Sequence, residues 1–222
     1  MGKLIVFEGT DGSGKSTQFE LLAKRLEAEQ IGFQRLRFPQ YEEPSSALIR
    51  MYLGGAFGDD PEAVNAYAAS TFYAVDRYAS YQRVWKDYYQ GGGLVVSDRY
   101  TTSNAVHQGS KVQEAERAEF FRWLYDLEYD RMGLPRPDLV VLLDMPVELS
   151  EQLMRKREQS TGTHADIHER DEDYLKKCRD VALHAAKYYG WRTVSCAKDG
   201  VIRSVEDIHA EVYAIVKSCL ED

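Results

Sequence analysis

With 222 residues, 44% of them hydrophobic and 29% charged, the sequence is typical of one soluble globular domain, and we treat residues 1–222 as a single domain. The formal net charge of -8 argues against nucleic acid as the main partner, because nucleic-acid binding needs a concentrated basic face. The apolar run at residues 4–7 is too short for a signal or membrane segment, so we expect a cytoplasmic protein without a membrane partner. Three widely spaced cysteines, Cys178, Cys196 and Cys219, are expected to be reduced thiols.

Short apolar runs alternate with longer segments of helical periodicity along the chain. The runs predicted to be strands are Lys3–Glu8, Phe33–Phe38, Leu94–Ser97, Leu139–Asp144 and Arg192–Cys196. The segments predicted to be helices are Lys15–Gln30, Pro61–Gln90, Glu114–Tyr129, Glu148–Gln159, Asp171–Tyr189 and Val205–Leu220. The strands lack an apolar–polar alternation, as is typical of a parallel sheet covered by helices. This pattern predicts an α/β fold of three layers, with a parallel sheet of about five strands and helices on both faces.

Two segments interrupt the alternation. Residues 38–61 contain several glycines, and residues 160–169 are short and polar. Segments of this kind in compact domains are commonly mobile loops and lids. We therefore place a short lid at about residues 155–170.

The first predicted strand is followed directly by Gly9-x4-Gly14-Lys15-Ser16, which has the spacing of a P-loop and lies at the start of a predicted helix. The glycines allow backbone N–H groups to converge on phosphate oxygens at a positive helix end, and Lys15 adds a cation. The Ser16 hydroxyl can be a ligand of Mg²⁺. The alternative is a Gly-rich turn that only caps a helix. The loop is predicted to bind the β and γ phosphates of ATP through Gly9, Thr10, Asp11, Gly12, Ser13, Gly14, Lys15, Ser16 and Thr17.

A P-loop alone is compatible with kinases, GTPases, ATPase motors and synthetases. The base-reading Asn-Lys-x-Asp sequence of GTPases is absent, and the chain is short for a motor module. A second phosphate-binding arginine and a polar lid favour a nucleoside monophosphate kinase. A non-catalytic regulator that opens and closes with ATP is the alternative from another class.

Five stretches in chain order, FEGTDGSGKSTQ, FPQY, YAVDR, SDRYTTSNAVHQG and GLPRPDLVVLLD, resemble the thymidylate kinase family. The resemblance spans residues 3 to about 215, and the DRY and GLPRPDL stretches are narrower signals than the P-loop. It implies transfer of the γ-phosphoryl group of ATP to dTMP with Mg²⁺, on a P-loop NTPase fold with a lid, in a homodimer. A kinase for another nucleotide or nucleoside acceptor is the nearest rival.

The resemblance assigns the phosphate chemistry to a few charged side chains. Arg99 follows a predicted strand at its carboxyl edge, where a guanidinium can bridge the donor and acceptor phosphates. Asp98 is assigned to Mg²⁺ or its waters; the alternative is an Asp–Arg pair that braces the sheet edge. Asp11 resembles a carboxylate that meets the 3'-hydroxyl of the acceptor sugar, or else it only stabilises a helix N-terminus.

Acceptor recognition is likewise carried over from the family. Tyr73 is expected to stack on the base and Arg77 to donate to a thymine carbonyl, since residues four apart share a helical face. Tyr73 could instead belong to the core, because its predicted helix is rich in aromatic residues. The further positions assigned to the acceptor are Phe38, Tyr41, Ser103 and Asn104.

Two departures from the family pattern affect the predicted site. His107 stands where the family usually has Tyr or Phe, so we expect either weaker discrimination against a ribose 2'-hydroxyl or a shifted acceptor. Some family members have an arginine at the position of Gly12, and members with glycine there take their catalytic cations from the lid. Arg157 is the favoured candidate; the alternative is that the basic residues there form only a solvated cluster at a helix end. Asp166 and Glu169 resemble the acidic lid motif that closes on the acceptor.

Overall fold

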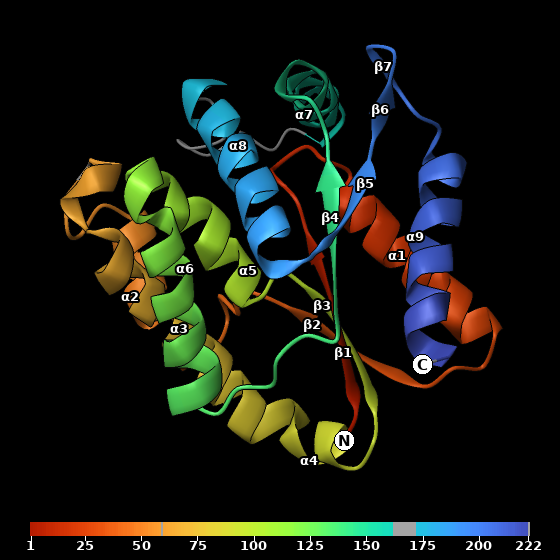
Figure 1. Ribbon diagram of the computed structural model, residues 1–222, viewed down its shortest axis with the longest axis horizontal. Coiled ribbons are helices and arrows are strands. Elements are labelled where there is room, and N and C mark those ends of the chain that lie inside the picture. The colour runs from red at the N-terminus through yellow and green to blue at the C-terminus, as the bar shows by residue number, and fades with distance from the viewer. Residues whose placement is uncertain (59, 162–171, 222) are drawn as a thin grey trace. The chain divides into compact units, whose positions relative to one another are not determined.

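The computed structural model describes residues 1–58, 60–161 and 172–221, with the backbone alone at residues 61, 156–161 and 172 (Figure 1). The chain forms two compact units. Unit 1 contains residues 1–6 and 33–138, and unit 2 contains residues 7–32 and 139–222. Each unit is described by itself below. A single domain over residues 1–222 with a lid at about 155–170 stays a prediction.

A five-stranded parallel sheet has the strand order β2-β3-β1-β4-β5. The strands are β1 Lys3–Glu8, β2 Phe33–Arg37, β3 Leu94–Asp98, β4 Leu139–Asp144 and β5 Arg192–Ser195. All five predicted strands are confirmed, with ends that differ by one residue at β2, β3 and β5. Within unit 1 the last pair in the β2–β3 register is Arg37 with Asp98, and within unit 2 Asp144 pairs with Ser195. Polar and charged side chains thus follow the apolar runs at the carboxyl ends of these strands, where ligands bind in open α/β sheets.

The helices of unit 1 are more broken than the periodicity predicted. They are α2 Ala47–Leu53, α3 Ala66–Ser80, α4 Lys86–Gln90, α5 Thr101–Ser103 and α6 Arg117–Tyr125. The predicted interruption at residues 38–61 contains α2 and a 3-10 turn at Pro44–Ser46. The predicted helix Pro61–Gln90 is wrong at its start, because Asn65 caps α3 by accepting a hydrogen bond from the Ala68 N–H at 2.9 Å.

A π-helical turn at Tyr81–Trp85 separates α3 from α4. The Trp85 side chain is fully buried, and its ring centroid lies 4.6 Å from that of Tyr81 and 5.9 Å from that of Tyr89. An extra residue in the turn shifts the helical phase, so that all three rings face the core. Packing of large rings therefore overrides regular α-helix here.

A second π-helical turn, Asn104–Gln108, follows α5. A third, Asp126–Arg131, follows α6 and extends past the end of the predicted helix Glu114–Tyr129. It keeps Glu128 fully buried and leaves Tyr129 6% exposed. Such turns are frequent at functional sites, because they redirect single side chains.

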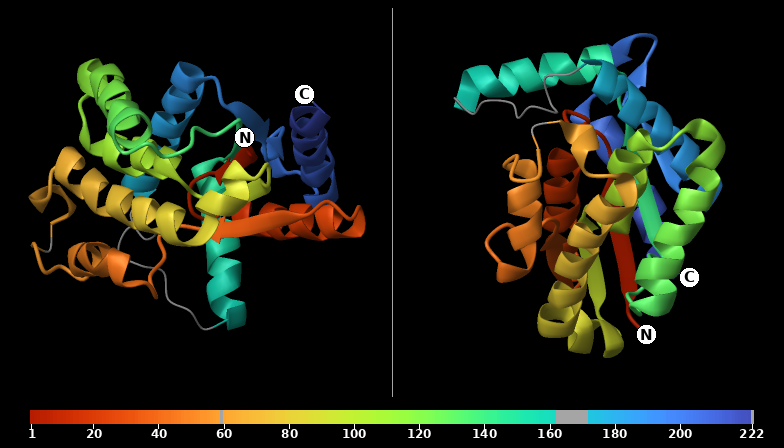
Figure 2. Two further views of the ribbon diagram at one scale, coloured as in Figure 1. Left: turned by 90° about the horizontal axis from the view of Figure 1, so that it is seen from below. Right: turned by 90° about the vertical axis from the view of Figure 1, so that its left-hand side faces the viewer.

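Unit 2 matches the predicted pattern closely. Its helices are α1 Lys15–Ala28, α7 Val147–Thr161, α8 Glu172–Tyr189 and α9 Val205–Glu221. In Figure 1, α8 and α9 lie on opposite sides of the β4–β5 pair, and Figure 2 shows α1 beside α9. Helices on both faces were predicted because the strands lack an apolar–polar alternation.

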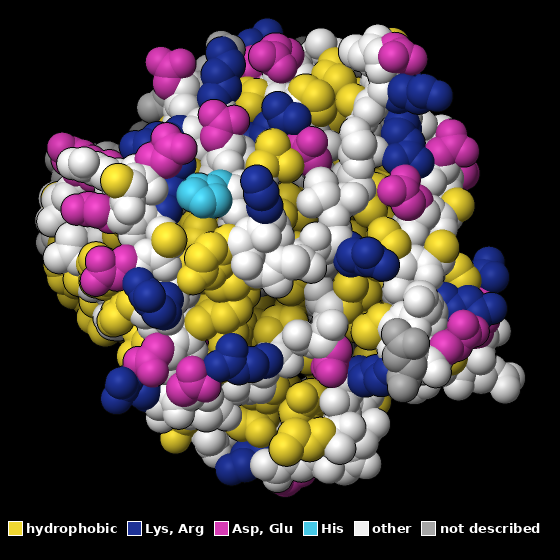
Figure 3. Space-filling model, in the orientation of Figure 1, with side chains coloured by type: hydrophobic (Ala, Val, Ile, Leu, Met, Phe, Trp, Pro, Cys, Tyr) yellow, Lys and Arg dark blue, Asp and Glu magenta, His cyan; other side chains and the backbone are white. Residues whose placement is uncertain are grey.

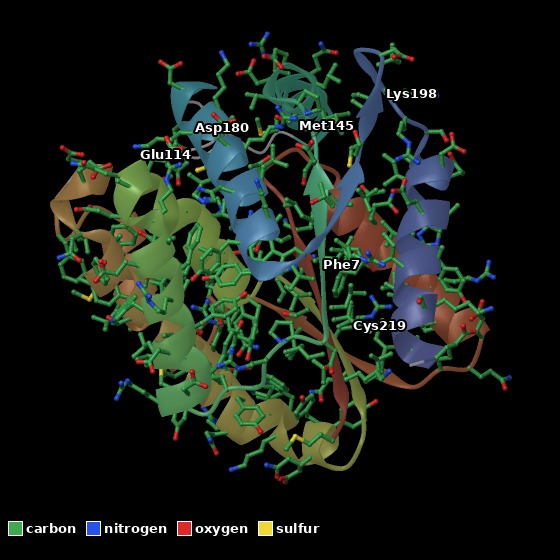
Figure 4. The ribbon with its side chains drawn as sticks, viewed as in Figure 1. Phe7, Glu114, Met145, Asp180, Lys198 and Cys219 are labelled. Atoms are coloured by element: carbon green, nitrogen blue, oxygen red, sulfur yellow. The ribbon has the colours of Figure 1, made fainter. Side chains whose placement is uncertain are left out.

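Two details of unit 2 concern its core and its edge. Phe7, labelled in Figure 4, packs edge-to-face on Phe19 of α1 with ring centroids 6.0 Å apart.

The hairpin of β6 Ala197–Lys198 and β7 Val201–Ile202 was not predicted, since strands of two residues are too short to produce a periodic pattern.

The three cysteines form no disulfide, as predicted. Burial, the largest cause, raises the pKa of the Cys196 thiol to about 12, and the nearby Asp144 carboxylate acts in the same direction. This cysteine is therefore held in the unreactive thiol form.

The face of the molecule in Figure 3 carries basic and acidic side chains interspersed among apolar ones. That mixture agrees with the acidic net charge, and the basic groups in this view are not gathered into one stripe. Within the described part of the chain, none of the helices is both long and apolar enough to cross a membrane.

Candidate active site

The phosphate loop of unit 2 leads from β1 into α1. Gly14, with φ +84°, precedes the helix, and no side chain caps this end by a hydrogen bond. The first turn of α1, which the structure describes in full, contains no acidic residue. A helix N-terminus presents unsatisfied N–H groups and a partial positive charge. This end of α1 is therefore suited to bind an anion such as a phosphate.

Gly12 is required by the conformation of the loop and by its packing on α7. Its φ is +76°, and a Cβ atom there would lie 2.7 Å from the Ser150 carbonyl oxygen and 2.9 Å from Cγ of Met154. A side chain at this position would be strained and would also clash with α7. The tight turn is closed by the Ser13 N–H, which donates to the Thr10 carbonyl at 3.1 Å. Glycine at position 12 thus allows the loop to turn tightly and to pack closely on α7.

The polar side chains of the loop differ in their exposure. Lys15 is only 8% exposed and Thr10 only 5%, Asp11 is half-buried, and Ser16 and Thr17 are exposed. Mg²⁺ bound with a nucleotide takes one or two protein oxygens, and phosphates and waters supply the rest. The exposed Ser16 hydroxyl at the start of α1 fits that donor set. Among the described residues, no cluster of three or more His, Cys, Asp or Glu side chains could hold a metal ion.

Arg99 in unit 1 follows β3 in a left-handed backbone conformation, with φ +68°. For a residue other than glycine this costs about 1–3 kcal/mol and is most common at functional sites. The Ser97 hydroxyl donates to the Arg99 carbonyl at 2.6 Å, which supports the turn. Nη1 of the Arg99 guanidinium lies 3.4 Å from Oγ of Ser103 and 2.8 Å from Nε2 of His107. Three predicted acceptor residues are therefore brought together in unit 1.

Asp98 is the last residue of β3, and only 3% of it is exposed. Its Oδ2 lies 3.2 Å from Nε of Arg37 on the neighbouring strand β2. The pairing was not predicted, because the two residues are adjacent only through the parallel register. A role of Asp98 in binding Mg²⁺ or its waters stays a prediction, and Arg37 is a second cation at this edge.

Two residues assigned to the acceptor, Arg77 and Asn104, surround the same buried carboxylate, that of Glu128. Glu128 accepts hydrogen bonds from Nε and Nη2 of Arg77 at 2.7 and 2.6 Å. It also lies 3.4 Å from Nδ2 of Asn104, which donates to the Ser70 carbonyl at 3.1 Å. Burial tends to lower the pKa of the Arg77 guanidinium, but the Glu128 carboxylate more than offsets this, and the net pKa is raised. Arg77 is thus a permanent cation in the core of unit 1.

The aromatic residues assigned to the acceptor differ in burial. Phe38 is 3% exposed and packs on Tyr100 with ring centroids 6.0 Å apart. Tyr73 on α3 is half-buried, and desolvation by burial is the main reason that its pKa lies above the ordinary value. Tyr41 is 48% exposed, and its carbonyl accepts a hydrogen bond from Nη1 of Arg50 at 2.6 Å. Tyr73 therefore keeps an accessible part, which a residue belonging only to the core would lack.

The family model for thymidylate kinase matches residues 7–212. The thymidylate kinase of Mycobacterium tuberculosis is 33% identical over 199 residues, which covers 88% of this chain and 92% of the relative. The probable thymidylate kinase of Thermococcus gammatolerans is 32% identical over 221 residues, covering 98% and 97%.

The chain belongs to the thymidylate kinase family. A solved structure of thymidylate kinase from Candida albicans has a TM-score of 0.71 and 21% identity, and it covers 98% of this chain and 92% of that one. At this identity the likeness supports the fold alone. The predicted membership of the thymidylate kinase family and the P-loop α/β fold are confirmed.

Some residues assigned by the resemblance to thymidylate kinases fall in the segment predicted to be a lid. The Arg157 side chain, Asp166 and Glu169 lie outside the described residues. The basic side chain of α7 that the structure does describe, Arg155, is exposed and lies 3.4 Å from Glu151. The catalytic role of Arg157 and the acceptor contacts of Asp166 and Glu169 stay predictions.

Sequence reasoning missed two acidic residues that organise the thymidylate kinase fold. In unit 2, Asp144 at the end of β4 forms a bidentate pair with Arg179 of α8, at 2.7 and 3.1 Å. In unit 1, Glu128 is the partner of Arg77. The signal for Glu128 was present, since it continues the spacing of the buried residues Phe121 and Leu124, and a carboxylate on a buried stripe needs a cationic partner.

His107 replaces the Tyr or Phe that is usual in thymidylate kinases, and its contact with Arg99 determines its tautomer. A guanidinium only donates, so Nε2 of His107 accepts and Nδ1 carries the proton. The imidazole is therefore both smaller than the usual ring and engaged by a predicted catalytic side chain. Weaker rejection of a ribose hydroxyl stays the prediction.

His107→Tyr is expected to raise the preference for dUMP over UMP by about tenfold, because a larger ring would crowd the 2'-hydroxyl. The two nucleotides differ only in that hydroxyl, so their ratio of kcat/KM values isolates its effect. The preference for dTMP over UMP is expected to rise in parallel. If both ratios equal those of the wild type, His107 has no part in sugar selection.

Proposed function

We propose that this protein transfers the γ-phosphoryl group of ATP to dTMP and so forms dTDP and ADP. The observation that carries the proposal is a P-loop at an uncapped helix end, in a chain whose match to the thymidylate kinase family covers residues 7–212. The arginine at the end of β3 supplies the second cation that phosphoryl transfer between two nucleotides needs.

ATP is the donor in this proposal. Backbone N–H groups of the loop and of the first turn of α1 bind its β and γ phosphates, and Lys15 neutralises their charge. The burial of Lys15 strengthens this effect, because a charge in a low-dielectric environment is poorly screened. Ser16 would hold Mg²⁺, and Asp98 would contact the ion or its waters. When bound, Mg²⁺ supplies positive charge to the phosphates.

The acceptor dTMP is assigned mainly to side chains of unit 1, with three further positions in unit 2. Arg77 and Asn104 contact the edge of the base, and Phe38 and Tyr73 contact its faces. The further acceptor positions are Tyr41, Arg99, Ser103 and His107 in unit 1, and Asp11, Asp166 and Glu169 in unit 2. The connection of Arg99 to Ser103 and His107, and of Arg77 to Asn104 through Glu128, supports a common site for most of the residues in unit 1.

The reaction needs no nucleophilic side chain, because a phosphate oxygen of dTMP is already an oxyanion. That oxygen forms a bond to the γ-phosphorus while the bond from the γ-phosphorus to the β–γ bridging oxygen breaks. ADP leaves with the bridging oxygen. The protein contributes by aligning the two phosphates and by neutralising charge with Lys15 and Arg99. Exclusion of water, which the lid would provide, prevents hydrolysis of ATP.

The alternatives left open by the sequence are not favoured. The family model and the relatives reported above are all thymidylate kinases by name, and they cover most of the chain. This gives no support to a non-catalytic regulator or to a different acceptor. A cytoplasmic location and a homodimer remain proposals.

The test is ADP release by the purified protein with Mg-ATP and a panel of acceptors, namely dTMP, dUMP, UMP, dCMP, dGMP and thymidine. We expect dTMP to give the highest kcat/KM and thymidine to give none, because thymidine lacks the attacking phosphate. A higher kcat/KM for another nucleotide would refute dTMP as the substrate. Tight ATP binding with no acceptor-dependent release would refute the kinase itself.

A further inference from the structure

The Glu128 side chain is the centre of a hydrogen-bond network that sequence reasoning did not foresee. It is fully buried, and four groups surround its carboxylate. They are Nε of Arg77 at 2.7 Å, Nη2 of Arg77 at 2.6 Å, Oγ1 of Thr101 at 2.7 Å and Nδ2 of Asn104 at 3.4 Å. An ionised carboxylate accepts about four hydrogen bonds, so this network satisfies it.

Stability alone is a weak explanation for this arrangement. A buried ion pair loses hydration on folding, and well-packed apolar residues of similar size are often as stabilising or more so. The surroundings of Glu128 are aromatic and could accept such a replacement: Tyr100 and Tyr129 stack beside it with ring centroids 6.4 Å apart. The polar network is better explained by what it does to Arg77 and Asn104.

The network determines which hydrogen-bond groups Arg77 can offer to a ligand. Arginine has five N–H donors. Glu128 engages one on Nε and one on Nη2, and the Tyr100 carbonyl engages one on Nη1 at 3.3 Å. One N–H on each terminal nitrogen is left over. Arg77 can therefore present only donors.

The same network fixes the orientation of the Asn104 amide. Its Nδ2 faces two oxygens, those of Glu128 and of the Ser70 carbonyl, and only an NH₂ group satisfies both. The amide oxygen Oδ1 is therefore the atom that can meet a ligand. Asn104 presents an acceptor, whereas Arg77 presents donors.

We infer that Glu128 is a positioning residue that sets this donor–acceptor polarity and thereby selects a pyrimidine with a 4-oxo group and an N3–H. Thymine and uracil offer an acceptor at position 4 beside a donor at N3, which complements Arg77 and Asn104. Cytosine offers a 4-amino donor beside an N3 acceptor, which opposes both. The inference deepens the proposed function and rests on it, since it assigns Arg77 and Asn104 to the acceptor base.

Glu128→Gln is the test, because it keeps the shape of the side chain and replaces one acceptor oxygen by an NH₂ donor. The new NH₂ group would face the N–H donors of Arg77 or of Asn104. The Asn104 side-chain amide would then no longer be held in one orientation and could rotate. We expect the kcat/KM ratio of dTMP to dCMP to fall at least about tenfold, mainly through a higher KM for dTMP. The KM for ATP is expected to stay within about twofold of the wild type. The matched control is Asp130→Asn, which removes an exposed carboxylate from the same turn and should leave all these values unchanged.

Thr101→Val provides a second test that does not disturb the charge. It removes the 2.7 Å hydrogen bond to Glu128 with little change in shape, and we expect the dTMP to dCMP ratio to fall about threefold. If Glu128→Gln lowers only the melting temperature and keeps the wild-type ratio, the inference is overturned. If that variant does not fold, an unchanged ratio in Thr101→Val overturns it.

The activity of the wild-type protein toward dTMP distinguishes a failure of the inference from a failure of the proposed function on which it rests. If the wild type does not phosphorylate dTMP, the proposed function fails and the inference falls with it. If the wild type phosphorylates dTMP and the variants keep its selectivity, the inference alone fails.

Discussion

Lys15→Ala is expected to lower kcat at least about 100-fold, while the melting temperature stays close to that of the wild type. Lys15 begins α1 directly after the glycines of the loop and is largely buried there. Its ammonium group would neutralise charge on the transferring phosphoryl group, which the backbone N–H groups alone do only in part. Steady-state ADP release at saturating dTMP measures the effect.

Lys24→Ala is the matched control, because Lys24 lies on the same helix with an exposed side chain. It removes the same charge away from the loop, so kcat should be unchanged. A Lys15→Ala protein with near-normal kcat would show that the cation at the loop is not part of the transfer.

Arg99→Ala is expected to lower kcat by about 10²–10³-fold, with a smaller change in the KM for ATP. The strained backbone at φ +68° and the contacts to Ser103 and His107 hold this guanidinium in one place. A guanidinium can bind two phosphate oxygens at once, so Arg99→Lys should restore only part of the lost rate. Single-turnover measurements separate the transfer step from product release.

Arg83→Ala serves as the control for charge. The Arg83 side chain is 70% exposed and lies 3.6 Å from Glu43, so its removal should leave kcat unchanged. Equal rates in Arg99→Ala and the wild type would remove Arg99 from the mechanism. Full recovery in Arg99→Lys would show that the two-point contact is unnecessary.

The sequence predicted the elements of the fold well where one physical signal was dominant. β1 and β4 were predicted at their observed bounds, because strands buried on both faces produce continuous apolar runs. The prediction was poorer where packing overrides periodicity, as at the π-helical turn Tyr81–Trp85. One extra residue in a helical turn rotates the following residues around the helix axis. The apolar spacing over a segment as long as Pro61–Gln90 still looks helical, so the sequence does not reveal this change.

The candidate site was predicted from motifs, and motifs do not contain the supporting contacts. Glu128 and Arg77 are 51 residues apart, and the pairing of Arg37 with Asp98 depends on the β2–β3 register. The contact between Arg99 and His107 joins the end of β3 to the π-helical turn Asn104–Gln108. Such partners are determined by tertiary packing, and a single sequence indicates them only as charged residues on apolar faces.

The central claim is that ATP phosphorylates dTMP, and the most direct test identifies the product. The purified protein would be mixed with Mg-ATP and dTMP, and the nucleotides would be resolved by phosphorus NMR over the course of the reaction. We predict that dTDP and ADP appear in equal amounts while inorganic phosphate stays at background. ADP with inorganic phosphate and no dTDP would show that the protein hydrolyses ATP without transferring the phosphoryl group, which would contradict the account.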